Sequence, residues 1–476
     1  MKKMTQLLNQ VLEDIVPLES DRKKISTLSK ELEKKINMEC EKAGVAAKIG
    51  IEGSVAKDTW LIDDPDIDIF IRLPLSIPKE NLDEDILRIA KKATKGSKQI
   101  QRYAEHPYLE AFINDIRVNI VPCYQVDKGN WKSATDRTPY HTKYVRKNLN
   151  QGLKNEVRLL KKFLKGINVY GAEIKTGGFS GYLCELLIIH YNSFIKTLEA
   201  FSNYKKPIII DLKNYYSDKK INSSLFFSEP LIVIDPVDKN RNVASALTSE
   251  KLDELIGAAR EFLKEPTENF FFPKKPVIYS INTLKSKFEN RGSSIIFLQL
   301  NNIKTVPDVL WGQLYKTQKS LITLLQQNDF KILHKAVWTD EKSFTIFVLE
   351  LETHLLPKIK QHFGPPLEFN NQSNAFLLKY SKNASVVCGP YLQNNRWTIL
   401  TTLNYQNALN LLEEKLLADN RNIGIPKLIS KVIGENFKIL IGNEISTLYQ
   451  ANPDFATFIT GFLIGKPSWL KSYYSQ

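Results

Sequence analysis

Cysteine is scarce in this sequence of 476 residues. The four cysteines are Cys40, Cys123, Cys184 and Cys388. They lie far apart and form no CxxC pair, which argues against a zinc knuckle and against a disulfide framework. We therefore expect a reducing, cytoplasmic compartment.

Long apolar runs are also missing. The most apolar late stretch, Phe455 to Gly465, is well short of the ~20 residues that a membrane helix requires. The first fifteen residues, MKKMTQLLNQVLEDI, contain acidic residues where a secretion signal would keep an apolar segment. We expect a soluble protein without a membrane segment.

Basic charge, by contrast, is in surplus. The chain has 66 lysines and arginines against 52 acidic residues, a formal net charge of +14, and 43% of its residues are hydrophobic. That hydrophobic content is typical of a globular protein. A basic surplus fits either solubility alone or contact with polyanions such as nucleic acid. The chain is too long for one hydrophobic core, so we expect two to four domains.

The first ~145 residues show an α/β or α+β pattern of elements. Apolar residues at helical spacing predict a helix through 25–36, and short strands are predicted at 46–52 and 66–73. Residues 82–102 are predicted to be helical. Two apolar segments flank Asn114-Asp115, a pair suited to a tight hairpin turn.

The remaining chain divides into a helical and a mixed part. Residues 150–265 have a mainly helical pattern, and the aromatic- and proline-rich stretch 266–276 is a candidate boundary. Beyond it the pattern predicts a strand, a helix and two strands at 294–300, 310–328, 331–338 and 344–351. That order suggests a small sheet with a helix on one face.

Two acids stand out in the apolar segment DIDIFIR. In a strand Asp66 and Asp68 share one face, about 6.5 Å apart, and would repel each other unless a cation lay between them. Magnesium prefers oxygen ligands and bridges phosphates, and a pair of metal ions is the usual arrangement for nucleotidyl transfer. The alternative is a chance pattern on a solvated edge strand.

A glycine turn precedes these acids by a dozen residues. Gly53-Ser54 would present backbone N–H groups and a hydroxyl, and Lys57 adds positive charge. Together they resemble a phosphate cradle. A phosphate-binding turn followed by metal-binding carboxylates is a coherent pairing.

The combination GSVAKDTWL…DIDIF resembles the signature of the polymerase-β-type nucleotidyltransferase superfamily. More narrowly, several runs resemble the archaeal-type, class I CCA-adding enzymes. These runs are RYAEHPY (102–108), VPCY (121–124), DRTPYH (136–141), VRLLKKFLK (157–165), YGAEIKTGGFSGYLCELLI (170–188) and DPVDKNRNVA (235–244). The resemblance covers about 40–250 closely and thins over the last 200 residues.

The resemblance implies a multidomain α+β protein. Its expected parts are a polymerase-β-like nucleotidyltransferase head at 1–148, a mainly helical central, nucleotide-binding domain at 149–272, and a mixed α/β tRNA-binding body and tail at 273–476. The implied reaction is template-independent addition of CCA to the 3′ end of tRNA from CTP and ATP, with Mg²⁺ and release of pyrophosphate. The implied partners are the tRNA acceptor arm, ATP and CTP, with no membrane; a homodimer is left open.

The resemblance also assigns roles to single residues. Asp66 and Asp68 would hold metal ions. The implied nucleotide-binding residues are Ser54, Lys57, Thr138, His141, Lys161, Tyr170 and Arg241; many relatives have arginine at position 57. Lys161 and Tyr170 would contact the triphosphate, and Arg241 the incoming base.

Three of these assignments have plainer alternatives. Lys161 lies on a stripe of basic residues at helical spacing, with Lys154, Arg158 and Lys165, and most such stripes are solvated helix faces. His141 could be a structural histidine, and Arg241 could form a salt bridge at a domain interface.

One position departs from the family pattern. The third acid is expected three residues before the proline of VPCY, where this chain has Asn119. Alternation puts Asn119 on the face that meets Asp66 and Asp68, so it takes the third catalytic and metal-binding position. An amide carries no charge and cannot accept a proton. The nearest spare acid, Asp115, lies in the predicted turn.

Three explanations of Asn119 compete. They are a deliberate replacement of the acid, a natural variant that uses metal-bound hydroxide, and a protein that binds RNA without extending it. Two other functions therefore stay open beside CCA addition. One is another RNA 3′-nucleotidyltransferase, such as a poly(A) polymerase; the other is a catalytically impaired tRNA-binding variant.

Overall fold

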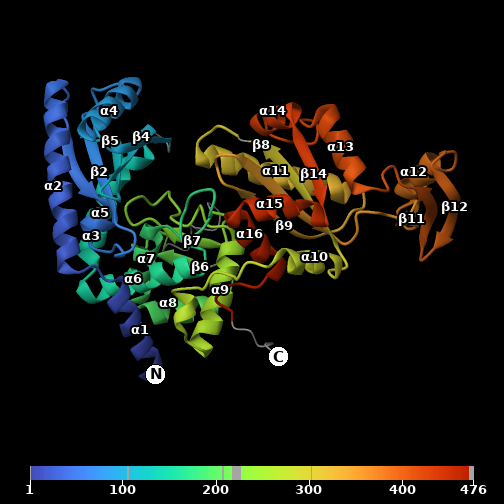
Figure 1. Cartoon of the computed structure of the whole chain (residues 1–476), viewed down its shortest axis with the longest axis horizontal. Coiled ribbons are helices and arrows are strands. Elements are labelled where there is room, and N and C mark those ends of the chain that lie inside the picture. The colour runs from blue at the N-terminus through green and yellow to red at the C-terminus, as the bar shows by residue number, and fades with distance from the viewer. Residues whose placement is uncertain (1, 104–106, 206–207, 217–226, 302, 471–476) are drawn as a thin grey trace. The chain divides into compact units, whose positions relative to one another are not determined.

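The computed structural model describes residues 2–103, 107–205, 208–216, 227–301 and 303–470. The chain forms two compact units. The first comprises Met1–Lys275 together with Lys466–Gln476, and the second comprises Pro276–Gly465. Figure 1 shows that each unit contains both helices and strands, so the expected multidomain α+β class is confirmed.

The elements of the first unit are as follows. Its helices are α1 (Lys2–Ile15), α2 (Glu19–Lys42), α3 (Gly53–Lys57), α4 (Lys79–Ala93), α5 (Thr138–Asn148), α6 (Gln151–Gly166), α7 (Gly181–Tyr191), α8 (Phe194–Ser202) and α9 (Ser249–Lys264). Its strands are β1 (Lys48–Glu52), β2 (Asp66–Leu73), β3 (Lys98–Tyr103), β4 (Pro107–Ile113), β5 (Ile116–Tyr124), β6 (Ile208–Asp211) and β7 (Leu231–Ile234).

A five-stranded sheet forms the N-terminal part of this unit, in the order β1-β2-β5-β4-β3. Strand β2 runs antiparallel to β1 and parallel to β5. Ile67 and Ile69 of β2 are fully buried in one core with side chains of α2 and α4. Because strand side chains alternate, Asp66 and Asp68 lie on the opposite face of the sheet.

The turn between β4 and β5 is the predicted hairpin. Asn114 and Asp115 both have positive φ, at 50° and 63°. Two consecutive residues of this kind form a type I′ turn, whose twist matches that of the strands it joins.

The prediction of a helix over 82–102 is wrong in its second half. Helix α4 ends at Ala93, and residues 98–103 form β3, an edge strand paired antiparallel with β4. Gly96, with φ of +92°, stands between the two elements. The positive φ that glycine allows there ends the helical path and lets the chain turn back along the sheet.

Helices dominate the rest of the first unit, as predicted. The centre of their core is Phe163 of α6, which packs against aromatic rings of α8, α9 and the segment that follows. A short parallel pair, β6 with β7, accompanies these helices. The stretch 266–276 includes the junction between the two units, whereas the expected boundaries at 148 and 272 stay predictions.

The elements of the second unit are as follows. Its helices are α10 (Ile281–Glu289), α11 (Pro307–Gln327), α12 (Asn370–Tyr380), α13 (Ala408–Asp419), α14 (Lys427–Glu435), α15 (Ser446–Ala451) and α16 (Pro453–Ile464). Its strands are β8 (Ser294–Asn301), β9 (Ile332–Thr339), β10 (Phe344–Leu351), β11 (Ile359–Pro366), β12 (Val386–Gln393), β13 (Arg396–Thr402) and β14 (Phe437–Ile441).

The second unit contains the predicted small sheet, in the order β14-β8-β10-β9. Leu298 on one face of β8 packs in a core with α11, as the strand–helix–strand–strand order predicted. The other face, which includes Phe297, packs against α16. The sequence pattern did not predict that this second face would be covered. A second sheet, β11-β13-β12, packs against α12, where the ring of Phe376 stacks on that of His362 of β11. In the part of the chain that the structure describes, no helix has both the length and the apolarity to cross a membrane.

Candidate active site

Three polar side chains meet where β2 and β5 run side by side. The parallel register places Asp66 opposite Arg117 and Asp68 opposite Asn119. Nδ2 of Asn119 donates to Oδ1 of Asp66 at 2.9 Å and to Oδ1 of Asp68 at 3.0 Å. Asn119 therefore faces both carboxylates, as the alternation predicts.

The two carboxylates are held in an unfavourable environment. Burial and the neighbouring charge of Asp68 raise the pKa of Asp66 to about 7. Burial also raises the pKa of Asp68, although the hydrogen bond from Asn119 opposes this. Arg117 donates to Asp66 at 3.1 Å and offsets part of the charge. A pair of acids strained in this way is stabilised by a cation.

The donor set fits a divalent cation. Asp66 and Asp68 direct oxygen atoms at one common point, which the amide nitrogen of Asn119 approaches. Turning that amide over would present its oxygen, a neutral ligand, at the same point. No group of three histidine, cysteine or acidic side chains suited to a metal occurs among the described residues. Here the third position is an amide.

A glycine turn lies directly against the second acid. Glu52, the last residue of β1, pairs with Asp68, and Gly53 follows with φ of +67°. A Cβ atom on Gly53 would lie 1.9 Å from Oδ2 of Asp68. Only glycine fits this close approach, and the half-buried Ser54 follows it at the start of α3. The turn and the carboxylates are therefore parts of one site.

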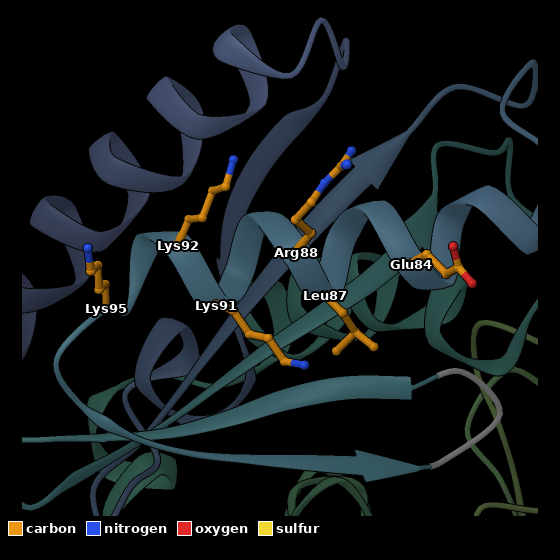
Figure 2. Close-up of a pocket in the computed structure, with 6 residues that line it drawn as sticks. All are labelled: Glu84, Leu87, Arg88, Lys91, Lys92 and Lys95. Carbon is orange, nitrogen blue, oxygen red and sulfur yellow. The ribbon is translucent and has the colours of Figure 1, made fainter.

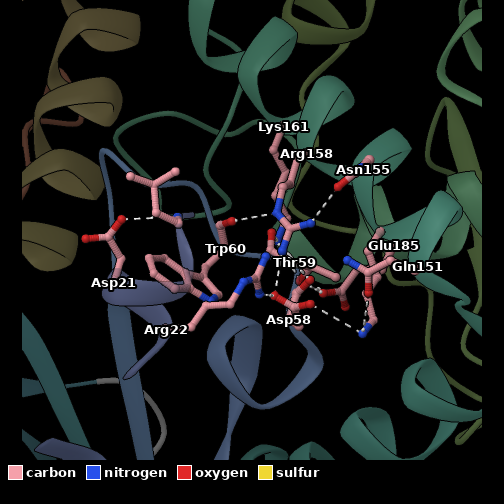
Figure 3. Close-up of polar contacts among 12 residues, drawn as sticks. Asp21, Arg22, Asp58, Thr59, Trp60, Gln151, Asn155, Arg158, Lys161 and Glu185 are labelled. Carbon is pink, nitrogen blue, oxygen red and sulfur yellow. Dashed lines mark hydrogen bonds and ion pairs between the residues drawn. The ribbon is translucent and has the colours of Figure 1, made fainter. Parts of the chain in front are cut away.

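A buried ionic network surrounds Glu185, and Figure 3 shows three of its members, Thr59, Lys161 and Glu185. Nζ of Lys57 lies 2.6 Å from Oε2 of Glu185, and the hydroxyl of Thr59 donates to Oε1 at 2.6 Å. Lys161 donates to the carbonyl oxygen of Thr59 at 3.0 Å, and its ammonium lies 3.8 Å from Glu185. The two lysines predicted to bind phosphate thus converge on one carboxylate.

The basic stripe on α6 is not a solvated face. Arg158 is completely buried, and Lys161 is 3% exposed. Arg158 donates to the carbonyl oxygens of Trp60 and Asp58 and to the Asp58 carboxylate, which also pairs with Arg22 (Figure 3). The plainer alternative for this stripe is wrong because the loop that follows α3 covers it.

Tyr170 lies beside Lys161 above the start of α7. A Cβ atom on Gly181 would lie 3.1 Å from the Tyr170 hydroxyl and 3.5 Å from Nζ of Lys161. Burial raises the pKa of the Tyr170 phenol well above its usual range, so it remains a hydrogen-bond donor at neutral pH. A side chain at position 181 would therefore crowd both polar groups.

A second cluster forms around Asp235, a fully buried acid in DPVDKNRNVA. His141 and Arg241 each lie 2.8 Å from its Oδ2, and the Tyr182 hydroxyl donates to Oδ1 at 3.1 Å. The rings of His141 and Tyr182 stack with centroids 4.1 Å apart. The hydrogen bond and charge of His141, together with Arg241, lower the pKa of Asp235 to about 2 despite its burial.

Two of the plainer alternatives concern residues of this cluster, namely a structural role for His141 and a salt bridge for Arg241. Arg241 pairs with an acid six residues earlier in its own loop. His141 is held by that same acid, and burial lowers the pKa of its imidazole. Thr138, half-buried at the start of α5, lies one helical turn before His141.

Sequence reasoning missed two acids at the centre of these networks. Glu185 and Asp235 lie in the runs YGAEIKTGGFSGYLCELLI and DPVDKNRNVA, but the sequence pattern assigns no role to either acid. A single acid in an otherwise apolar helix was the available signal for Glu185, because such a group requires a buried cationic partner. Nothing in the local sequence named Lys57 as that partner.

A pocket of about 620 Å³ lies elsewhere, on α4. It is lined by Glu84, Leu87, Arg88, Lys91 and Lys92 of the helix and by Lys95, which follows the end of the helix (Figure 2). Helix α4 packs on the face of the sheet that carries Ile67 and Ile69. The pocket is therefore on the other side of the sheet from Asp66 and Asp68, and we exclude it from the site.

Three family descriptions match consecutive parts of this chain. "Nucleotidyltransferase domain" matches residues 32–141, "tRNA nucleotidyltransferase, second domain" matches 155–272, and "CCA-adding enzyme, C-terminal domain" matches 291–442. The first two ranges contain the acids, the glycine turn, the buried ionic network and the Asp235 cluster.

Curated relatives match nearly the whole chain. A CCA-adding enzyme of Methanosarcina mazei is 36% identical over 452 residues, which are 94% of this chain and 96% of that protein. CCA-adding enzymes of Methanocaldococcus jannaschii and Methanothermobacter thermautotrophicus are 37% and 33% identical, over 94% and 97% of this chain and 98% of each relative. Among solved structures, a cytoplasmic RNA terminal U-transferase aligns over 58% of this chain and over its own full length. The sequence identity is 13% and the TM-score is 0.45.

Proposed function

The chain belongs to the family of CCA-adding enzymes, which are tRNA nucleotidyltransferases, and on that premise we propose that it completes tRNA 3′ ends. The reaction adds C, C and A from CTP and ATP without a nucleic-acid template and releases pyrophosphate. The observation that carries this proposal is the meeting of Asp66 and Asp68 with the Gly53 turn, where a Cβ atom would be 1.9 Å from Asp68.

The two carboxylates would hold magnesium. Their paired oxygens and raised pKa values support a divalent cation at this point. When bound, the ion supplies positive charge for the phosphate oxygens and increases the acidity of the attacking 3′-hydroxyl. Asn119 can orient the two acids and offer one neutral oxygen, but it cannot take a proton from that hydroxyl.

The triphosphate would lie against the turn and the two buried lysines. Ser54 adds a hydroxyl donor, Lys57 and Lys161 add charge, and Tyr170 adds a phenolic donor beside Lys161. Ammonium groups act on phosphate as point charges. Support comes from the positions of Lys57 at the end of α3 and Lys161 on α6, because both charges act on Asp68 and oppose the rise in its pKa.

The incoming base would be recognised around Arg241. Its guanidinium presents donors in a fixed fork, which can satisfy acceptor atoms common to cytosine and adenine. One side of the fork is held by Asp235, and that acid also holds His141. Thr138 would lie next to the incoming base, one helical turn before His141.

The tRNA itself would be held largely through its phosphates. A net charge of +14 supports this, and the affinity should fall steeply as salt rises. We propose that the second unit binds the acceptor arm. We also propose that the protein is cytoplasmic. A homodimer stays a prediction, which light scattering at several protein concentrations would test.

Incorporation of labelled nucleotides tests the proposal against its rivals. The substrate is tRNA lacking its CCA end, offered CTP and ATP separately and together. We expect two C residues with CTP alone and one terminal A when both are present. Repeated addition of A would favour a poly(A) polymerase, which family membership disfavours. Binding of tRNA without any incorporation would favour the impaired variant.

A further inference from the structure

Glu185 is a completely buried acid on a helix whose other buried residues are apolar or cysteine. Its carboxylate accepts from Lys57 and Thr59, each at 2.6 Å. Thr59 in turn accepts from Lys161, at 3.0 Å through its carbonyl oxygen and 3.2 Å through its hydroxyl. One acid on α7 thus connects the loop after the glycine turn to a lysine on α6.

We infer that Glu185 is a positioning residue for the nucleoside triphosphate. Its carboxylate orients Lys57 directly and Lys161 through Thr59. It thereby strengthens the binding of CTP and the binding of ATP by the same factor. This inference rests on the proposed function, in which those two lysines bind the triphosphate.

The charges in this network require such an acid. Two buried ammonium groups repel each other, and each loses the water that would stabilise its charge. Burial and the charge of Lys57 lower the pKa of Lys161, whereas Glu185 raises it. Without the carboxylate, Lys161 would tend toward a neutral amine, which attracts phosphate oxygens much less.

The geometry also explains why one residue affects both substrates equally. Both lysines that Glu185 contacts are proposed to meet the triphosphate, which CTP and ATP share. The groups proposed to read the base are held by hydrogen bonds to a different acid, Asp235, and Lys57 approaches that cluster at the Tyr182 ring, 5.8 Å from its centroid. Loss of Glu185 should therefore leave the choice between C and A unchanged.

The second unit offers a matched control for a purely structural role. Glu350 is 4% exposed, accepts from Arg291 at 2.6 Å and from Ser293, and so also joins a buried carboxylate to a cation. Glu185→Gln and Glu350→Gln remove the same charge from similar surroundings. Both should lower the thermal unfolding midpoint, but only the first should change nucleotide binding.

The experiment measures KM for CTP, ATP and tRNA, together with binding of CTP by equilibrium dialysis in the absence of tRNA. For Glu185→Gln we expect KM for both nucleotides and Kd for CTP to rise about tenfold or more, since a charged hydrogen bond is lost. The KM for tRNA should stay within about twofold of the wild-type value, and Glu350→Gln should bind CTP like the wild type.

Thr59→Val is the milder second variant, since it keeps every charge and nearly the same shape. It should weaken CTP binding about threefold, as expected for one neutral hydrogen bond. In a double-mutant cycle, Lys57→Met should weaken CTP binding less in the Glu185→Gln protein than in the wild type, because the acid acts through the lysine.

Unchanged or tighter CTP binding in Glu185→Gln would overturn the inference, and so would strictly additive effects in the cycle. A rise in KM for only one nucleotide would also overturn it. If the wild-type protein adds no nucleotide to tRNA, the proposed function fails, while the dialysis still tests the role of Glu185 in binding a triphosphate.

Discussion

Asn119 and Asp68 lie opposite each other in the parallel pair β2–β5, with Nδ2 of the amide 3.0 Å from Oδ1 of the acid. The amide thus occupies the place where relatives of this family are expected to have a third carboxylate. In this orientation the uncharged amide donates its Nδ2 hydrogens to both acids, and only its other orientation would offer an oxygen to a metal ion.

Asn119→Asp is expected to raise the rate of nucleotide addition at least about tenfold. The new carboxylate would complete the acidic site and could accept the proton of the attacking hydroxyl, effects that usually exceed tenfold. Single-turnover incorporation on tRNA lacking CCA measures the change. Asp115→Asn, in the adjacent turn, is the control and should leave the rate unchanged. Equal rates for Asn119→Asp and wild type would mean that position 119 is not the third site.

Gly53→Ala is expected to lower the rate about 100-fold, because a displacement near 1 Å at a reacting centre has effects of that size. The added Cβ would lie 1.9 Å from Oδ2 of Asp68 and must push the acid or the turn aside. Gly96→Ala is a matched control, since Gly96 also has positive φ but meets nothing within 4 Å. The control should lose some stability and keep its rate. Comparable rate losses in both variants would contradict a specific contact with Asp68.

Arg158→Lys should destabilise the protein by about 3 kcal/mol, because an amine cannot replace the fork of donors that Arg158 directs at Asp58, Trp60 and Asn155. Thermal unfolding followed by circular dichroism would show a lower midpoint. Arg88→Lys removes an exposed arginine that pairs with Asp85 at 2.6 Å, and it should change stability by less than about 0.5 kcal/mol. A midpoint that does not move for Arg158→Lys would mean that the network adds little stability.

The stability that Asp235 contributes should depend on pH in a narrow acidic range. Its folded-state pKa is about 2, below its ordinary value of 3.8, so the ionised acid stabilises the fold by about 2 kcal/mol above pH 3.8. That contribution is lost as pH falls from 3.8 through 2, and below pH 2 the group is protonated in both states. Asp235→Asn should therefore be less stable than wild type at neutral pH, and the difference should shrink from pH 4 to pH 2. Urea unfolding at several pH values measures it, and a difference that stays constant down to pH 2 would contradict this account.

The order of local elements was largely readable from the sequence. Period-two alternation predicted strand β2, with Asp66 and Asp68 on one face. The pair Asn114-Asp115 predicted the hairpin turn, because both residues tolerate positive φ. The predicted helix over 82–102 is wrong at residues 98–102, because edge strand β3 is selected by pairing with β4 rather than by its own pattern. The same alternation predicted that Asn119 would meet the two acids.

By itself, the sequence determined the family and which acids, glycine and lysines could form a site, because those features lie in short motifs whose spacing follows strand and turn geometry. Only the tertiary structure decided how the buried charges pair. Lys57 meets Glu185 across 128 positions of the chain and Arg158 meets Asp58 across 100. A buried charge is stabilised by whichever opposite charge the fold brings within reach, and that choice is set by the packing of α6 and α7 against the loop after α3 rather than by any local pattern.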